Sequence, residues 1–145
     1  MSIHFLLVLN RQGKTRLIKW FNANYSTQEK QRYVQEIHRL IASRDTKNQS
    51  NFVEYQQLKL VYRRYAGLYF ISAIDGYDSE LSYLESLHFF VEILDTYFNN
   101  VCELDLVFNF YKLYAILDEV YLGGELQEIL KEKVLERLAY LDKLD

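Results

Sequence analysis

The sequence predicts an α+β domain in which helices cover an antiparallel sheet. Two observations lead to this prediction. Short apolar runs joined by turn signals dominate the first half of the chain, and apolar residues at helical spacing dominate the second half. The predicted order is β-β-α-β-β-β-α-α-α over one domain, residues 1–145. Because strands joined by tight turns pair antiparallel, we expect a single antiparallel sheet of five strands.

The chain opens with a predicted β-hairpin and a helix. Apolar residues fill 3–9 and recur in 15–21, and the sequence NRQG between these two strands is a turn signal. Ser26 and Glu29 match a capping box, in which the Ser side chain caps the helix and the Glu side chain reaches back. The helix is predicted to run to about residue 43. Its apolar face carries Tyr33, Ile37, Leu40 and Ile41.

A second hairpin and a central strand follow. Residues 52–55 and 58–63 are predicted to pair around the turn Gln56-Gln57. Residues 67–74 form a continuous apolar run, which is typical of a strand buried on both faces. We therefore place this strand at the centre of the sheet.

Three helices complete the predicted domain. Asp78 is a plausible N-cap for the first, whose apolar residues recur at 84, 87, 91, 94 and 98. The second extends from about Cys102 to the pair Gly123-Gly124, which can supply a left-handed C-cap. The third is amphipathic and charged, from about residue 126 to 144.

The second of these helices is unusually apolar. Within NVCELDLVFNFYKLYAIL, residues 100–117, only Asp105, Asn109 and Lys112 form a polar stripe. A helix that is apolar nearly all round is normally buried on every side. Either a large internal core, a partner protein or an apolar ligand is expected to cover it.

Composition excludes several classes of function. The net charge of −3 argues against binding to nucleic acid, and the absence of an apolar run of 18 residues argues against a transmembrane helix. The first residues lack a basic leader, so we expect a cytosolic protein. The single cysteine, Cys102, excludes an internal disulfide and a cysteine-based zinc site, and we expect it to be a small core residue.

No motif for catalysis or for cofactor binding is present. The three histidines, His4, His38 and His88, are far apart, and Glu103 and Asp105 fit a helix N-terminus better than a reactive carboxylate pair. We therefore predict no enzymatic activity, no cofactor and no metal. A basic cluster on the first hairpin is either a solvated tip or a dock for an anionic group. It consists of Arg11, Lys14, Arg16 and Lys19.

Several long motifs resemble the small, or sigma, subunit of clathrin adaptor complexes. The most specific are RRYAGLYF at residues 63–70 and NVCELDLVFNFYK at residues 100–112. Similar motifs stand at 10–21, 50–55, 90–98 and 117–125, so the resemblance covers essentially the whole chain. It implies a longin-like fold, with a five-stranded antiparallel sheet between helices. It also implies a heterotetramer with three partners: a large alpha-type subunit, a beta subunit and a mu subunit. This chain is expected to contact the alpha-type subunit directly.

In this family the small subunit and its large partner bind acidic dileucine signals in the tails of cargo proteins. The signal is an acidic residue, three variable residues, and then Leu followed by Leu or Ile. The resemblance carries the basic contribution to Arg11 and Arg16. It carries the apolar pockets and the residues beside them to Tyr65, Ala66, Leu68, Phe70, Val91, Asn100, Val101 and Leu106.

The motif RRYAGLYF and Tyr111 resemble the plasma-membrane, or endocytic, adaptor. This form implies a peripheral protein at clathrin-coated pits, on the cytosolic face of the plasma membrane, that meets the membrane only through its complex. The sequences IDGYDSEL and LGGE resemble the Golgi and endosomal form instead. A third possibility is a longin-like subunit of another vesicle coat that serves only as a scaffold.

Overall fold

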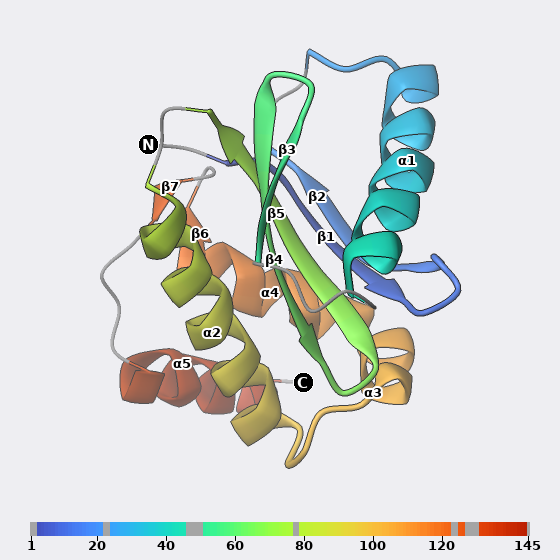
Figure 1. Cartoon of the computed structure of the whole chain (residues 1–145). Helices are drawn as coiled ribbons and strands as arrows, with labels where there is room; N and C mark the ends of the chain where they lie inside the picture. Colours follow the sequence, from blue (N-terminus) through green and yellow to red (C-terminus); the bar gives the residue numbers. More distant parts are fainter. Residues whose placement is uncertain are drawn as a thin grey trace.

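A five-stranded antiparallel sheet with the order β2-β1-β5-β4-β3 forms the centre of the fold (Figure 1). This computed structural model describes residues 3–21, 24–45, 51–76, 79–122, 125–126 and 131–144. The sheet confirms the predicted fold class and the predicted central place of the last strand. The strands are β1 (Ile3–Asn10), β2 (Thr15–Trp20), β3 (Phe52–Tyr55), β4 (Leu58–Tyr65) and β5 (Leu68–Asp75).

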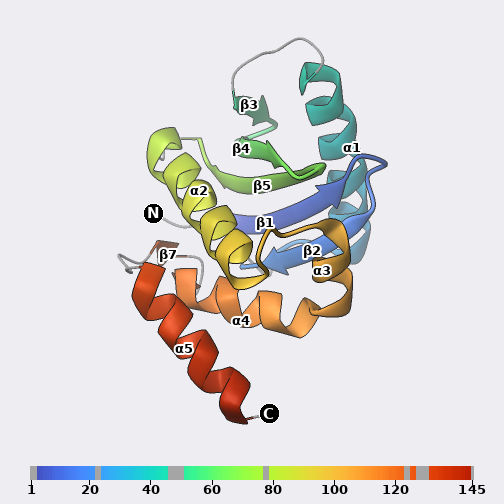
Figure 2. The same cartoon turned by 90° about the horizontal axis from the view of Figure 1, so that it is seen from below.

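Helices cover both faces of this sheet (Figure 2). Helix α1 (Thr27–Asp45) lies on one face, while α2 (Glu80–Tyr97) and α4 (Phe110–Val120) lie on the other. Helix α5 (Lys131–Leu144) forms an outer layer against α2 and α4, and the short α3 (Glu103–Phe108) lies beside β2 at the sheet edge.

Two separate clusters of buried residues result from this arrangement. Side chains alternate along a strand, so Leu6 and Val8 join the α2 side whereas Leu7 and Leu9 join the α1 side. Strand β5 divides in the same way, with Phe70 toward α2. Its continuous apolar run is therefore buried on both faces by helices of the same chain, as predicted.

The capping box at the start of α1 is confirmed, and the predicted cap of α2 is corrected. Glu29 N–H donates to Ser26 Oγ at 3.1 Å, and Ser26 N–H donates to Glu29 Oε1 at 3.3 Å. Helix α2 begins at Glu80, one residue later than predicted, and Ser79 is its N-cap, since the Ser79 side chain accepts a hydrogen bond from Ser82 N–H. Asp78 itself lies outside the described residues.

The apolar helix predicted after Cys102 is two helices, α3 and α4, separated at Asn109. Asn109 leaves helical backbone geometry (φ −124°, ψ 36°), and its side-chain amide donates to the Asp105 carbonyl at 3.2 Å. Asn competes for backbone hydrogen bonds in this way, which explains the break.

The end of α4 also differs from the prediction. Helix α4 ends at Val120 with Tyr121 as its C-cap, and a two-stranded pair, β6 (Tyr121–Leu122) with β7 (Glu125–Leu126), follows. The helix therefore ends before the glycine pair, which lies outside the described residues. Helix α5 begins at Lys131, later than predicted, since Leu126 belongs to β7.

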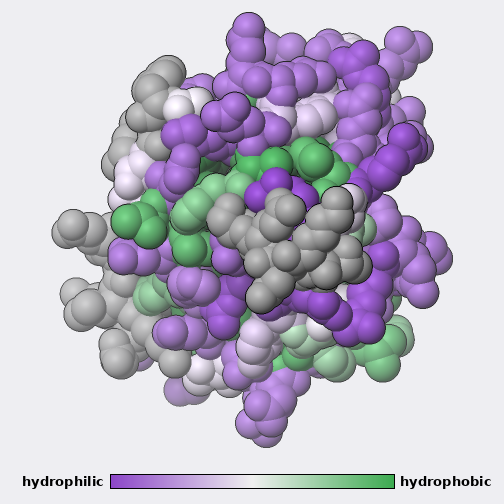
Figure 3. Space-filling model, in the orientation of Figure 1, coloured by the Kyte–Doolittle hydropathy of each residue, from purple (hydrophilic) through white to green (hydrophobic). Residues whose placement is uncertain are grey.

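The chain does not bury all of α3 and α4. Apolar side chains of both helices remain exposed, up to 73% for Phe108, and hydrophobic residues reach the surface over α3 (Figure 3). The expectation that this segment is buried on every side within the chain is therefore wrong. We call the exposed side chains the α3–α4 apolar patch; they are Leu104, Val107, Phe108 and Tyr111.

The polar stripe of this segment holds the outer helix in place. Lys112 Nζ donates to Asp142 Oδ1 at 2.9 Å, and the Tyr97 hydroxyl donates to the same carboxylate. These hydrogen bonds lower the pKa of Asp142 and raise the pKa of Lys112, so both groups are charged at neutral pH. The cluster links α2, α4 and α5, and it explains why a lysine stands in an apolar helix.

Candidate functional site

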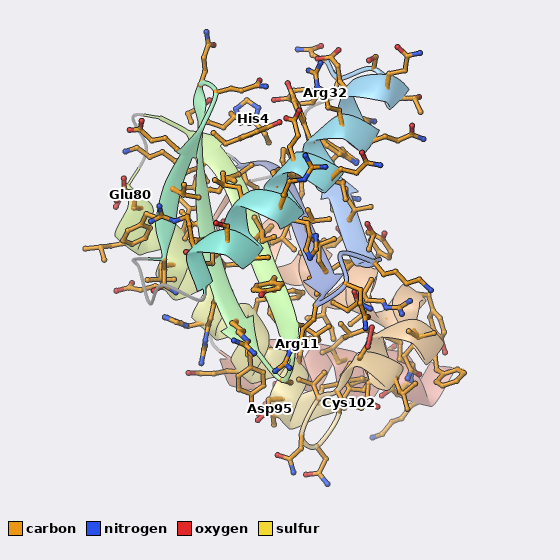
Figure 4. The ribbon with its side chains drawn as sticks, turned by 45° about the vertical axis from the view of Figure 1, so that its right-hand side comes forward. His4, Arg11, Arg32, Glu80, Asp95 and Cys102 are labelled. Carbon is orange, nitrogen blue, oxygen red and sulfur yellow. The ribbon has the colours of Figure 1, made fainter. Side chains whose placement is uncertain are left out.

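Segments from three separate parts of the chain meet at one end of the sheet. They are the β1–β2 turn, the β4–β5 turn, the loop between α2 and α3, and α3 itself (Figure 1). In Figure 4 the labelled side chains of Arg11, Asp95 and Cys102 lie at this end, whereas His4 lies toward the opposite end. Eight of the ten residues that the resemblance assigned to a peptide site belong to these segments or to the buried core, and the other two, Arg16 and Tyr65, lie in the adjoining strands β2 and β4.

The apolar members of this set form a common floor. They belong to the same buried cluster on the α2 side of the sheet, although they come from β5, α2, the α2–α3 loop and α3. Each is at most 4% exposed, so in this chain alone their side chains pack against the core. We call them the apolar floor; they are Leu68, Phe70, Val91, Val101 and Leu106.

The remaining apolar and amide residues form a rim above the floor. Ala66 is exposed and has a φ of 53°, as the first residue of the two-residue turn between β4 and β5. A positive φ is uncommon for a residue with a Cβ, and Gly67, the second residue of the turn, has a φ of 75°. Asn100 is exposed as well and has a φ of 74°. Tyr65 packs against the buried cluster from its edge.

Asp95, which the sequence did not single out, ties the rim together. The hydrogen bond to Asp95 is the main reason why the pKa of Tyr65 is raised. Val101 N–H donates to Asp95 Oδ1 at 3.1 Å, and Asn100 N–H donates to the main-chain oxygen of Asp95 at 2.9 Å. A single residue near the end of α2 therefore fixes the α2–α3 loop and the Tyr65 side chain at the β4–β5 turn.

Arg16 reaches the site from β2, where Glu103 holds it. Arg16 Nε donates to Glu103 Oε1 at 2.8 Å, and Asn10 Nδ2 donates to the same oxygen at 2.9 Å. These two hydrogen bonds hold the pKa of Glu103 below its usual value. Glu103 was expected to be stabilised by its helix N-terminus, and its hydrogen bonds to β1 and β2 were not visible in the sequence.

Two residues of the basic cluster on the first hairpin form ion pairs within the chain, and the other two are exposed to solvent. Lys19 Nζ lies 3.7 Å from Asp118 Oδ1, and Arg16 is paired with Glu103. Arg11 and Lys14 are exposed at the hairpin tip. Arg11 Nε lies 3.9 Å from where a Cβ on Gly67 would stand, so the tip approaches the β4–β5 turn.

A catalytic or metal centre has no support in the residues described. The histidines serve separate contacts: His4 pairs with Asp75, His38 with the carbonyl of Arg11, and His88 with Arg63. Among the described residues, no group of three or more His, Cys, Asp or Glu side chains is placed to hold a metal ion. Cys102 is exposed at the start of α3, so its expected place in the core is wrong.

A groove elsewhere on the molecule is separate from these residues. It lies between β2 and α1, with Ile18, Trp20 and Val34 among its lining residues. Lys30 Nζ lies 5.2 Å from the centroid of the Trp20 ring, which is a cation–π distance. The ten predicted site residues do not line this groove.

Comparison with known families identifies the chain. The family model "Clathrin adaptor complex small chain" matches residues 2–145. The chain belongs to this family. The resemblance seen in its motifs is thereby confirmed, and the family is one of adaptor subunits, in keeping with the predicted lack of enzymatic activity. None of the helices in the described part of this adaptor small chain is long and apolar enough to cross a membrane.

Individual relatives cover the adaptor small chain along its whole length. An AP-2 complex subunit sigma from Emericella nidulans is 62% identical over 146 residues, which is 100% of both chains. One from Saccharomyces cerevisiae is 55% identical over 147 residues, again 100% of both. An AP-1 complex subunit sigma-2 from Dictyostelium discoideum is 51% identical over 99% of this chain and 92% of that protein.

The fold agrees with these relatives. A chain of the structure described as "Homology model of the full-length AP-3 complex in a stretched open conformation" superposes with a TM-score of 0.76. It is 28% identical, and the match covers 98% of this chain and 94% of the other. The adaptor small chain is therefore a subunit of a multi-subunit adaptor complex.

Proposed function

We propose that this chain is the sigma subunit of an AP-2-type endocytic adaptor and that it helps to bind acidic dileucine signals. Relatives named AP-2 complex subunit sigma are 55–62% identical to it, compared with 51% for the AP-1 relative. Its partners in this role are a large alpha-type subunit, in direct contact, and beta and mu subunits. It acts at clathrin-coated pits on the cytosolic face of the plasma membrane, reaches the membrane only through the complex and performs no catalysis.

One observation carries the proposal for the peptide site. Side chains from β5, α2, the α2–α3 loop and α3 meet in one apolar floor, and the exposed Ala66 turn and Arg16 lie at its border. A leucine pair needs apolar contacts, and an acidic residue upstream needs a cation within reach. This end of the sheet offers both within one surface.

The apolar floor must open for the leucines to enter. Its side chains are buried in the chain alone, so a leucine side chain would displace contacts that the floor residues make within the buried cluster. Burial of each leucine contributes about 1.5–3 kcal/mol, from which the cost of ordering the peptide and of repacking the floor is subtracted. We therefore expect a weak and reversible contact, on the order of micromolar.

The large subunit accounts for the α3–α4 apolar patch. An exposed group of large apolar side chains is unfavourable in water and marks a protein contact in many proteins. The patch is on α3 and α4; α3 also carries Glu103 and contacts β2, the strand that carries Arg16. In this proposal the large subunit covers the patch and borders the peptide site from that side.

The function is tested first by identifying the partners. Tagged chain is purified from its native cells, and the co-purifying large subunits are identified by mass spectrometry. We expect the alpha-type subunit of the plasma-membrane adaptor. Recovery of the Golgi-type gamma subunit would instead assign the protein to an AP-1-type adaptor. This is the second candidate, because an AP-1 subunit is among the similar relatives. Recovery of no large adaptor subunit would contradict the assignment.

Substitution of Arg16 tests how the acidic residue is recognised. In the assembled complex, Arg16→Ser is expected to weaken binding of a Glu-containing dileucine peptide by about threefold to fivefold, because a rim ion pair contributes up to about 1 kcal/mol. A peptide with Gln in place of Glu is expected to bind the variant and the wild type equally. Both affinities are measured by fluorescence anisotropy.

Lys14→Ser is the matched control, because it removes the same charge from the tip of the same hairpin. We expect it to lower the affinity for the acidic peptide less than Arg16→Ser does. If Arg16→Ser weakens both peptides to the same extent, Arg16 does not recognise the acidic residue. A scaffold-only subunit would give no measurable binding of either peptide.

A further inference from the structure

Among the residues that the structure describes, Arg16 makes its side-chain hydrogen bond through Nε alone. Its Nε–H donates to Glu103 Oε1 at 2.8 Å, and Glu103 is the one hydrogen-bond partner that the described residues supply to its side chain. A guanidinium carries five N–H donors in a rigid planar fork. The N–H groups of both terminal nitrogens are therefore left for another acceptor. The Arg16 side chain is 25% exposed, so such an acceptor can arrive from solvent.

Glu103 is itself held in place by a buried amide. Asn10 is 5% exposed, and its Oδ1 accepts hydrogen bonds from the N–H groups of Gln12 and Lys14, at 3.0 and 2.9 Å. These backbone donors fix which side of the Asn10 amide is the oxygen, so Nδ2 must point away from the turn. Nδ2 donates to Glu103 Oε1 at 2.9 Å. The order of contacts runs from the hairpin turn through Asn10 and Glu103 to Arg16.

We propose that Glu103, oriented by Asn10, is a positioning residue that holds Arg16 by Nε and presents its terminal N–H groups to the acidic residue of a dileucine signal. This inference rests on the proposed function. It adds Glu103, which is not one of the ten predicted site residues, as a residue that determines specificity. It also explains why an acidic residue stands beside the arginine that would bind an acid.

Two opposing effects of Glu103 follow from its position. Its hydrogen bond removes rotamer freedom that Arg16 would otherwise lose when the peptide binds, which favours binding. Its negative charge repels the acidic residue of the peptide, which disfavours binding. Glu103→Gln removes the charge and keeps an oxygen acceptor at the same place, whereas Glu103→Ala removes both. The two variants therefore separate the effects.

The test compares these variants in the assembled complex with two peptides, one with Glu and one with Gln four residues before the leucine pair. For the Glu peptide, we expect Glu103→Gln to bind at least as tightly as the wild type. We expect it to bind about twofold to fivefold more tightly than Glu103→Ala, because the ordering of one long side chain acts only through Arg16 and is not expected to exceed the effect of removing Arg16. For the Gln peptide, we expect all three complexes to bind alike. Glu103 is 36% exposed, so neither substitution leaves a cavity in the core.

Three results would overturn the inference. Equal affinity of Glu103→Gln and Glu103→Ala for the Glu peptide would show that the hydrogen bond does not position Arg16. A loss for both peptides in Glu103→Ala would show a general structural role instead. A wild-type complex that does not distinguish the two peptides would overturn the proposed recognition of the acid itself, and it would be seen before any Glu103 variant is made.

Discussion

Replacement of Ala66 by Trp is expected to lower the affinity of the assembled complex for an acidic dileucine peptide about tenfold or more, because one leucine would lose its place and with it about 1.5–3 kcal/mol of burial. Ala66 is exposed in the β4–β5 turn, two residues before Leu68 of the apolar floor, so the indole would lie at the surface beside the proposed site and would not disturb the core. Binding is measured by fluorescence anisotropy, and folding by thermal unfolding of the complex.

The opposite end of the sheet provides a matched control. Gln56 is the first residue of the two-residue turn between β3 and β4, is exposed and has a φ of 55°, compared with 53° for Ala66. Gln56→Trp therefore places the same side chain on the same backbone geometry, far from the site. We expect it to leave peptide affinity unchanged. Equal affinity of the Ala66→Trp complex and the wild type would exclude this turn from the site.

A charge at Val91 is expected to have the largest effect on stability. Val91 is 2% exposed and belongs to the apolar floor. A carboxylate there would be buried without water, and we expect Val91→Asp to lower the free energy of unfolding by about 4 kcal/mol or more. Chemical denaturation followed by circular dichroism measures this change. A stability change below about 1 kcal/mol would contradict the burial of Val91.

Leu81 offers a control on the same helix. It is 66% exposed in the first turn of α2, so Leu81→Asp makes a similar change of an apolar residue to an acid at the surface. We expect its effect on the free energy of unfolding to stay within about 0.5 kcal/mol. Because Val91→Asp is expected to destabilise the fold, loss of peptide binding in that variant would report unfolding. Ala66 is exposed, so substitution of Ala66 tests the site without destabilising the core.

Local signals in the sequence were sufficient for most of the fold. The first hairpin, the capping box at Ser26 and Glu29, and the central strand each depend on residues that are close together in the chain. Two errors in the helix boundaries occurred where local signals compete. Asn109 interrupts an apolar run that has clear helical spacing, and Ser79 caps α2 although Asp78 was predicted to do so. Both choices depend on side chains competing for backbone hydrogen bonds, which spacing alone does not rank.

Only part of the candidate site could be predicted from the sequence. Resemblance to the family named the apolar residues and Arg16, and the structure places them at one end of the sheet. The residues that hold them, Asn10, Asp95 and Glu103, were not predicted to do so. Glu103 is 87 residues from Arg16 and 93 from Asn10 in sequence. Such contacts arise only when β1, β2 and α3 are assembled, so no periodicity reveals them.

The division of the core by the sheet has a consequence for how signal preference could change over evolutionary time. The apolar floor belongs to the cluster on the α2 side, whereas the cluster under α1 shares none of its buried residues. We expect substitutions in the floor to alter which leucine-like side chains are accepted while the α1 side keeps the strands in register. Under the proposed function, we therefore expect the α2 side to vary with the signals that the complex binds, and the α1 side to vary less.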